Sequence, residues 1–355
     1  MSDRDRDGLL ESVSVIICCH NSEARLQATL DHLAEQITEP GIFGEVVVVD
    51  NGSTDRTGEV AKDLWPEGFA PLRVVREDQL GLSYARERGV REAKCEYLCF
   101  IDDDNWVNPG FIQKVHDIFE THPEVACCGG PSVPVFEADP PTWFEACQSP
   151  FACGKQAEGA GHLTDGYLWG AGLSVRKSAY LQLRACGFRS LLTDRRGTSL
   201  SSGGDTELVC ALVLCGWKQW YDPKLGIKHY MPAARLSWSY LRRLCRAIGM
   251  SSVGIQHYLH SLNGPPKSVK EFAQRTWLWT VLSYTRQLMG YLPVVLKSRT
   301  DVLEGKQEIL NVETCIGLLC GLLRQWAVYD LRTLRVWKRF GRAYWRVSFK
   351  HPSME

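Results

Sequence analysis

The sequence predicts an α/β fold built on a mainly parallel sheet flanked by helices, followed by a C-terminal helical region. Three observations predict it. Short runs rich in valine, isoleucine and cysteine alternate with amphipathic stretches of helical length, as in successive strand–helix units. Two of these runs, Val46–Val49 and Tyr97–Ile101, are apolar throughout, which indicates strands buried on both faces of a sheet. Beyond residue 263, long apolar stretches containing tryptophan and arginine take their place.

The first half of the chain contains four predicted strand–helix units. The strands are expected over Ser12–Cys19, Gly44–Asp50, Leu72–Arg76 and Glu96–Ile101, and the helices that follow them over Glu23–Gln36, up to about Trp65, over Gly81–Ala93 and over Phe111–Thr121. Strands joined by helical crossovers run parallel, and ligands bind beyond their carboxyl ends. The ends of strands one, two and four are therefore expected to lie side by side.

The segment after Val125 departs from this regular alternation. Glu137–Thr164 contains prolines, glycines and aromatic residues without periodicity, which predicts a long loop able to close over a site. A glycine-containing strand is expected over Tyr167–Arg176, a helix over Leu208–Leu214 and a pair of strands over Trp217–His229.

The chain is expected to comprise an N-terminal tail over 1–11, an α/β domain over 12–262 and a helical C-terminal region over 263–355. Two apolar stretches, Trp277–Leu296 and Cys315–Leu323, do not reach the length and low charge of a membrane-spanning helix. Two interpretations of this region stay open. Its helices lie on a membrane surface, which the basic and aromatic residues of Arg332–Lys350 favour slightly, or they cap the α/β domain.

The composition excludes some classes of protein. Lysine plus arginine and aspartate plus glutamate number 41 each in the 355 residues, so bulk charge does not indicate nucleic-acid binding. The 14 cysteines include no Cys-x-x-Cys pair, which argues against a structural zinc site. With a charged start and no secretory signal, reduced thiols and a cytoplasmic location are expected, with peripheral contact to the cytoplasmic face of the cell membrane left open.

The most informative stretch is Tyr97–Asn105, an apolar run that ends on three consecutive carboxylates, Asp102–Asp104. Adjacent like charges repel, and a divalent cation such as Mn²⁺ or Mg²⁺ relieves that repulsion. The alternative is a solvated acidic turn that caps the next helix. The second strand ends on Asp50 and is built in the same way, and this repetition favours a binding site at the sheet edge.

Five segments together resemble the family 2 glycosyltransferases, which have the GT-A fold. They are Val15–Asn21, Val47–Asp55, Gly81–Gly89, Phe100–Asp104 and Gly203–Leu208. The second and fourth are the most specific, and the resemblance covers roughly residues 12–240. It implies a GT-A domain over 12–262, a nucleotide-sugar donor, with a UDP-sugar preferred, a divalent cation (Mn²⁺ or Mg²⁺) at the Asp-x-Asp site and inversion at the anomeric carbon.

The resemblance also implies the functional side chains. Those expected to bind the nucleotide sugar are Asn21, Asp50, Arg86, Asp102 and Asp103. Asp104 is expected to hold the metal, with His229 as a second ligand, and Asp205 to act as the general base. Arg235 either binds the diphosphate or lies on a solvated face, and the sequence does not choose between these.

The chain departs from the family pattern next to the expected base. The family commonly has Glu-Asp where this chain has Gly204-Asp205, so one carboxylate is missing. The Gln-x-x-Arg-Trp motif of processive relatives is absent after Asp205, which predicts single transfers. The expected function is therefore transfer of a sugar to a hydroxyl of a glycan or lipid-linked acceptor, for cell-surface polysaccharide synthesis.

Two other functions stay open. A nucleotidyltransferase would also use carboxylates on a parallel sheet, but it would need a basic, glycine-rich loop where this chain has His20–Glu23. A catalytically degenerate nucleotide-sugar-binding or scaffold protein would explain Gly204, although the retained Asp205 argues against it. Binding of a dinucleotide is not expected, because Gly-x-Gly-x-x-Gly, begun at Gly170, fails at Val175.

Overall fold

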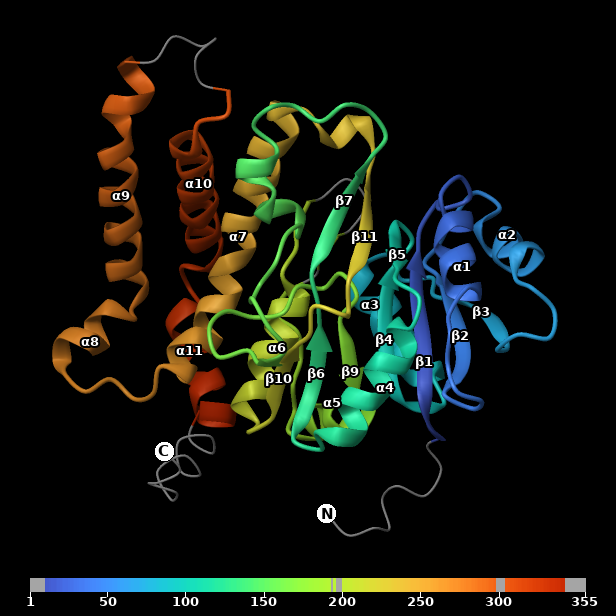
Figure 1. Cartoon of the computed structure of the whole chain (residues 1–355). Coiled ribbons are helices and arrows are strands. Elements are labelled where there is room, and N and C mark those ends of the chain that lie inside the picture. The colour runs from blue at the N-terminus through green and yellow to red at the C-terminus, as the bar shows by residue number, and fades with distance from the viewer. Residues whose placement is uncertain (1–9, 193, 196–199, 298–303, 342–355) are drawn as a thin grey trace. The chain divides into compact units, whose positions relative to one another are not determined.

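The computed structural model describes residues 10–192, 194–195, 200–297 and 304–341 (Figure 1). The chain forms two compact units. The first contains the chain up to Val135 together with Ala152–Ala185 and Trp217–Tyr230, and the second contains Phe136–Phe151, Cys186–Gly216 and the chain from Met231 onward. Most of the tail predicted over 1–11 lies outside the described residues, and the division predicted at residue 263 stays a prediction.

Within the described residues, the first unit is built on an eight-stranded sheet in the order β3-β2-β1-β4-β9-β6-β10-β8. The strands are β1 Leu10–Cys19, β2 Phe43–Asp50, β3 Leu72–Arg76, β4 Cys95–Asp102, β6 Val125–Gly129, β8 Gly161–His162, β9 Ser174–Arg176 and β10 Lys218–Tyr221. Strands β3, β2, β1 and β4 pair in parallel, as do β6 and β10, whereas β9 runs antiparallel to its neighbours. The predicted mainly parallel sheet is confirmed.

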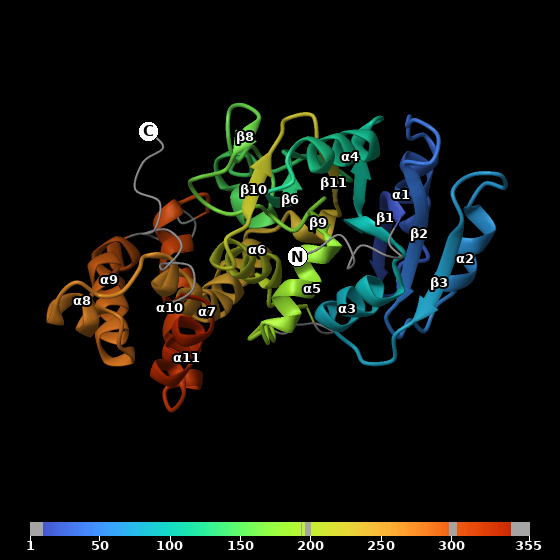
Figure 2. The same ribbon diagram turned by 90° about the horizontal axis from the view of Figure 1, so that it is seen from below.

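Helices cover both faces of this sheet. They are α1 Leu26–Ala34, α2 Thr57–Leu64, α3 Leu82–Glu92, α4 Phe111–Thr121 and α5 Lys177–Ala185. In the view of Figure 2, α4 lies above the sheet and α3 and α5 lie below it. Helix α3 approaches the sheet closely at Gly89, where an added Cβ would lie 2.4 Å from Cγ2 of Ile16.

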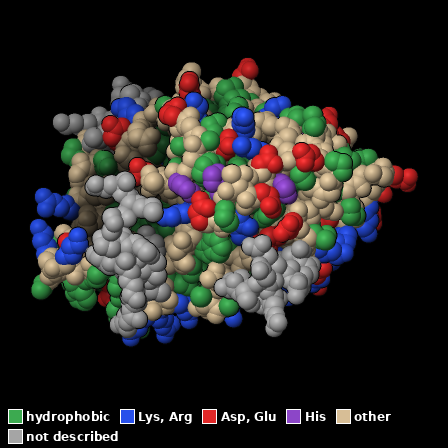
Figure 3. Space-filling model, turned by 60° about the horizontal axis from the view of Figure 1, so that its bottom comes forward, with side chains coloured by type: hydrophobic (Ala, Val, Ile, Leu, Met, Phe, Trp, Pro, Cys, Tyr) green, Lys and Arg blue, Asp and Glu red, His purple; other side chains and the backbone are tan. Residues whose placement is uncertain are grey.

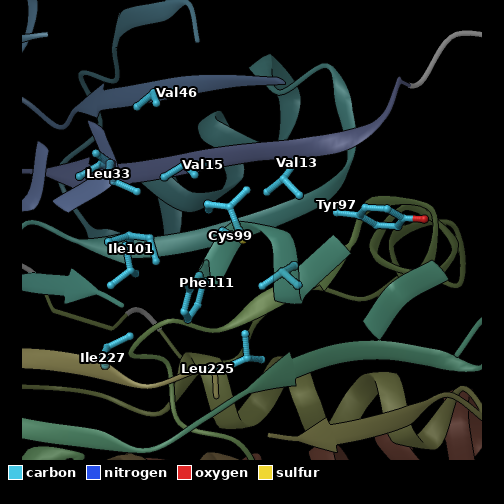
Figure 4. Close-up of a cluster of buried hydrophobic side chains, with 14 of the residues drawn as sticks. Val13, Val15, Leu33, Val46, Tyr97, Cys99, Ile101, Phe111, Leu225 and Ile227 are labelled. Carbon is cyan, nitrogen blue, oxygen red and sulfur yellow. The ribbon is translucent and has the colours of Figure 1, made fainter. Parts of the chain in front are cut away.

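The hydrophobic core follows from the alternation of side chains along β1. Val13, Val15 and Ile17 point to the same face and are fully buried. They pack with Phe111 of α4 and Leu33 of α1 in the cluster that Figure 4 shows. The β-branched run that predicted the strand therefore also supplies the core between the sheet and these helices.

The register of the parallel strands places the residues of the predicted site next to one another at the carboxyl ends of β1, β2 and β4. Cys18 of β1 pairs with Asp102 of β4, and Cys19 pairs with Asp50 of β2. A second, three-stranded sheet contains β5 Asn105–Val107, β11 Ile227–Met231 and β7 Ser132–Phe136, in the order β5-β11-β7. It places Asn105 opposite His229, directly after the three carboxylates.

The second unit is helical. Its helices are α6 Gly204–Leu214, α7 Trp238–Leu262, α8 Val269–Gln274, α9 Trp277–Lys297, α10 Gln307–Gln325 and α11 Tyr329–Val336, followed by a π-helical turn over Trp337–Gly341. Helices α7 and α10 meet at glycines: a Cβ on Gly249 would lie 2.2 Å from the carbonyl oxygen of Thr314. The predicted C-terminal helical region is confirmed within the described residues, and the part of Arg332–Lys350 beyond Gly341 lies outside them.

One predicted strand is largely wrong. Of Tyr167–Arg176, only Ser174–Arg176 is a strand. Gly172 adopts a φ of +72°, which interrupts an extended backbone. The side chain of Gln156 instead holds this segment, donating to the carbonyl of Tyr167 at 2.6 Å and accepting from the amide of Trp169 at 3.2 Å. The two strands predicted over Trp217–His229 are confirmed as β10 and β11, but they do not pair with each other, because β10 belongs to the eight-stranded sheet and β11 to a separate three-stranded sheet.

No helix in the described part of the chain is both long enough and apolar enough to cross a membrane. Acidic and basic side chains are interspersed over the face shown in Figure 3, in keeping with the equal numbers of positive and negative residues in the sequence.

Candidate functional site

Two loops at the carboxyl ends of β1 and β2 are joined by hydrogen bonds. Asn21, which adopts a φ of +51°, accepts from the backbone amide of Thr54 at 2.8 Å through its side-chain oxygen. The backbone amide of Asn21 donates to Oγ of Ser53 at 3.0 Å. Asn21 therefore connects the two loops at the edge of the candidate site. Its contact with a nucleotide sugar stays a prediction.

Asp50 ends β2 and is mostly buried. Its Oδ1 accepts from the amide of Ser53 at 2.9 Å, and its Oδ2 accepts from the Arg76 guanidinium at 2.7 Å. The next residue, Asn51, was missed by the sequence interpretation. Its side chain donates to the carbonyl of Gln79 at 2.8 Å and accepts from the amide of Gly81 at 2.8 Å. Asn51 thereby fixes the loop that leads into α3.

Asp102 and Arg86 both lie close enough to the Cys18 thiol to influence its charge. Burial raises the pKa of Cys18 to about 12, while the positive charge of Arg86 lowers it and the negative charge of Asp102 raises it. The Arg86 guanidinium also lies over the ring of Phe100, 6.0 Å from its centre. The first unit thus brings these two predicted nucleotide-sugar residues together at the ends of β1 and β4.

The Asp103 carboxylate contacts residues that lie just before α1. Its Oδ2 accepts from Oγ of Ser22 and, at 3.0 Å, from Nε of Arg25. Its carbonyl oxygen accepts from the hydroxyl of Thr29 at 3.0 Å. Burial and the charge of Asp104 raise the pKa of Asp103, and Arg25 opposes this shift. These contacts give Asp103 a structural task, and its predicted contact with the nucleotide sugar stays a prediction.

Asp104 and His229 face each other. Oδ1 of Asp104 lies 3.7 Å from Nε2 of His229, and both side chains are nearly buried. The backbone supports the pair, because the amide of Tyr230 donates to the Asp104 carbonyl at 2.9 Å. On the other side of the ring, Sγ of Cys153 lies 3.9 Å from Nδ1 of His229. Burial lowers the pKa of His229, but Asp104 and then Cys153 raise it more strongly, to about 9.

The pair offers an incomplete set of metal ligands. Among the residues that the structure describes, no group of three or more His, Cys, Asp and Glu side chains could hold a metal ion by itself. One carboxylate and one imidazole, once the imidazole has released its proton to the solvent, suit Mn²⁺ or Mg²⁺ when phosphate oxygens and water complete the shell. A further buried acceptor, Oδ1 of Asn105, has no hydrogen-bond partner among the described residues. The donor set therefore fits a cation that arrives with a phosphate-bearing substrate.

Asp205 belongs to the second unit, in the first turn of α6, and its position near the donor stays a prediction. Its Oδ1 accepts from the amide of Thr206 at 2.9 Å. Two residues later, Glu207 is fully buried and accepts from the hydroxyl of Tyr258 at 2.8 Å and from the amide of Leu191 at 2.7 Å. Arg235 ends a 3₁₀ turn in the same unit, and both interpretations of it stay open.

Comparison with known proteins finds similarity to glycosyltransferases. The model of glycosyl transferase family 2 matches residues 14–151. The uncharacterized glycosyltransferase EpsJ of Bacillus subtilis (strain 168) is 31% identical over 122 residues, which cover 34% of this chain and 34% of that protein. Glucosyl-dolichyl phosphate glucuronosyltransferase of Haloferax volcanii is 25% identical over 174 residues, covering 48% and 54% of the two chains. The chain thus spans about a third to about half of these relatives.

Among solved structures, the crystal structure of S. aureus TarS 1–349 aligns with a TM-score of 0.47 and 18% sequence identity. The alignment covers 86% of this chain and 90% of that chain.

Proposed function

We propose, from the premise that this chain carries a family 2 glycosyltransferase domain over residues 14–151, that the protein transfers a sugar from a nucleotide-diphosphate sugar to a hydroxyl group. The observation that carries the proposal is the buried pair of Asp104 and His229 directly beyond the ends of the parallel strands. The acceptor is a glycan or a lipid-linked sugar. A relative whose name specifies a glucosyl-dolichyl phosphate supports the lipid-linked class.

The proposed reaction assigns one task to each group of residues. Asp50, Arg86 and Asp102 bind the nucleotide and orient its diphosphate. Asp104 and His229 would hold a divalent cation, which neutralises the charge of the departing diphosphate when bound. Asp205 accepts the proton of the acceptor hydroxyl as its oxygen bonds to the anomeric carbon. The bond from that carbon to the diphosphate breaks on the opposite face, so the configuration inverts.

The test is binding of the donor with and without metal. Stabilisation against heat by a panel of UDP-sugars and other nucleotide-diphosphate sugars is measured for the wild type and for Asp104→Ala, each with and without Mn²⁺. In the wild type a fitting donor at a hundredfold excess over its dissociation constant stabilises the fold by about 2.7 kcal/mol. Asp104→Ala is expected to weaken Mn²⁺-dependent donor binding about tenfold or more, because one of two protein ligands is lost.

The control for this experiment is Asp63→Asn on the exposed face of α2, which removes a carboxylate without touching the candidate site. It should bind donor and Mn²⁺ like the wild type. Unchanged Mn²⁺-dependent binding in Asp104→Ala would contradict the metal assignment. The absence of stabilisation by any donor in the wild type would favour the degenerate or scaffold protein instead.

The second unit also carries an exposed apolar surface, which supports a peripheral contact with membrane. It is formed by side chains of α8, the first turns of α9, the end of α10 and the start of α11; the amide of Trp277 in α9 donates to the side chain of Asp330 in α11 at 2.9 Å. Its members are between 43% and 86% exposed and are Val269, Phe272, Leu278, Trp279, Leu282, Leu323, Trp326 and Leu331. The same part of the chain also has exposed basic residues: Lys267, Lys270, Arg324 and Arg335. Apolar and basic side chains together fit an anionic lipid surface.

This surface predicts binding to vesicles. The protein should sediment with vesicles that contain phosphatidylglycerol and much less with pure phosphatidylcholine. Replacing Phe272 and Trp326 together by serine should weaken binding about tenfold or more, because two large apolar side chains no longer enter the interface. Ile37→Ser, which removes a side chain that is 73% exposed in the first unit, is the matched control. Equal binding by the double variant would contradict the assignment of this surface.

A further inference from the structure

A carboxylate from the loop that precedes α6 occupies the space beside Gly204. Asp194 is 4% exposed, and its Oδ1 accepts from the amide of Gly204 at 2.7 Å. A Cβ added to Gly204 would lie 2.2 Å from Oδ2 of Asp194 and 2.7 Å from its Cγ. No side chain fits at position 204 while Asp194 keeps this place. Asp194 itself adopts a φ of +50°, an uncommon backbone conformation for a residue other than glycine.

The loop and the helix hold each other from both sides. Asp194 reaches from the loop to the first turn of α6, and Glu207 reaches back from α6 to the loop. Glu207 accepts from the amides of Leu191 and Leu192 at 2.7 and 3.2 Å. The same carboxylate accepts from the hydroxyl of Ser190, at 2.5 Å. This reciprocal arrangement, which resembles a capping box made across a loop, fixes the turn that carries Asp205.

We propose that Asp194 is a positioning residue for Asp205, an inference that rests on the proposed function. The first amides of a helix need acceptors. Asp194 satisfies the amide of Gly204, and the Asp205 carboxylate lies at the amide of Thr206. Without Asp194, the Gly204 amide is left without this acceptor, so the first turn loosens and the Asp205 carboxylate loses its fixed direction. The carboxylate that the sequence lacks at position 204 is thus supplied from the loop.

The first test compares Asp194→Ala with Asp194→Asn. Hydrogen exchange of the amides of residues 204–207 should accelerate in Asp194→Ala. With whichever of UDP-glucose, UDP-galactose or UDP-glucuronic acid supports turnover, kcat should fall about tenfold to a hundredfold while the KM for the donor stays unchanged. Asp194→Asn keeps an acceptor oxygen and should return kcat to within about fivefold of the wild type.

The second test is a double-mutant cycle with Gly204→Ala. Alone, Gly204→Ala forces Asp194 out of its place and should reproduce the loss of kcat. In the Asp194→Ala background the same methyl group has room, so it should add no further loss. Additive effects of the two substitutions would overturn the inference, and so would unchanged amide exchange and kcat in Asp194→Ala. If Asp194→Ala does not fold, Gly204→Ala alone still decides, because an unchanged kcat in that variant would overturn the inference.

Failure of this inference differs from failure of the proposed function. If Asp205→Asn retains full kcat, the assignment of the base is wrong. If Asp205→Asn loses kcat while Asp194→Ala and Gly204→Ala keep it, only the positioning by Asp194 is wrong.

Discussion

Replacement of Asp205 by asparagine is expected to lower kcat by about a hundredfold to ten-thousandfold, the range that general-base catalysis contributes. Asparagine has nearly the same shape as aspartate and can still accept from the amide of Thr206, so the first turn of α6 should persist. It cannot take a proton from the acceptor hydroxyl. The measurement is steady-state transfer with the donor that stabilises the wild type against heat.

Donor binding separates loss of catalysis from loss of structure in this experiment. The thermal stabilisation of Asp205→Asn by donor and Mn²⁺ should equal that of the wild type, because no donor ligand is assigned to Asp205. Glu308→Gln is the matched control, since Glu308 is an exposed acidic residue in the first turn of another helix of the same unit. A kcat for Asp205→Asn within a few-fold of the wild type would remove Asp205 as the base.

The sequence predicts the first unit well because its central strands β1, β2 and β4 are mostly buried on both faces. Four consecutive valines, Val46–Val49, are too apolar for a solvent-exposed strand, so they identify β2 as a buried strand. The polar residues that follow β2 then mark the edge of the sheet where the candidate site lies. Helix α4 begins and ends at the predicted residues. Helix α7 received no prediction, although Ser237 accepts from the amide of Tyr240 as an N-cap at 3.3 Å.

The direction of side chains at the site could not be predicted. The three carboxylates at the end of β4 are the same residue type in the sequence, yet Asp103 contacts Ser22 and Arg25 while Asp104 faces His229. Those partners lie far away along the chain. The contact of Cys153 with His229 likewise carries no local signal, because the two residues are 76 positions apart in the sequence. Long-range partners become visible only in the folded chain.

The second large effect concerns stability of the second unit. Glu313 of α10 lies between two arginines of α7: its Oε1 accepts from Nε of Arg242 at 2.8 Å, and its Oε2 accepts from Nε of Arg246 at 2.7 Å. The Glu313 side chain is 3% exposed, whereas the arginines are 47% and 48% exposed. Replacing both arginines by alanine should therefore destabilise the protein by about 3–5 kcal/mol, because it leaves a buried carboxylate without a partner.

Because Glu313 is buried and the two arginines are half-exposed, we expect removal of the arginines and removal of the glutamate to change stability by different amounts. Glu313→Ala should destabilise less than the double arginine variant, because the half-exposed guanidinium groups can turn to water once the carboxylate is gone. Adding Glu313→Leu to the double variant should recover stability, since the buried charge is then removed as well. Arg243→Ala, an exposed arginine on the same helix that contacts the ring of Tyr240, is the control and should change stability little. Urea unfolding of these variants measures the differences in the free energy of unfolding. An equal loss of stability in Glu313→Ala and in the double arginine variant would show that burial of the carboxylate does not govern the interaction.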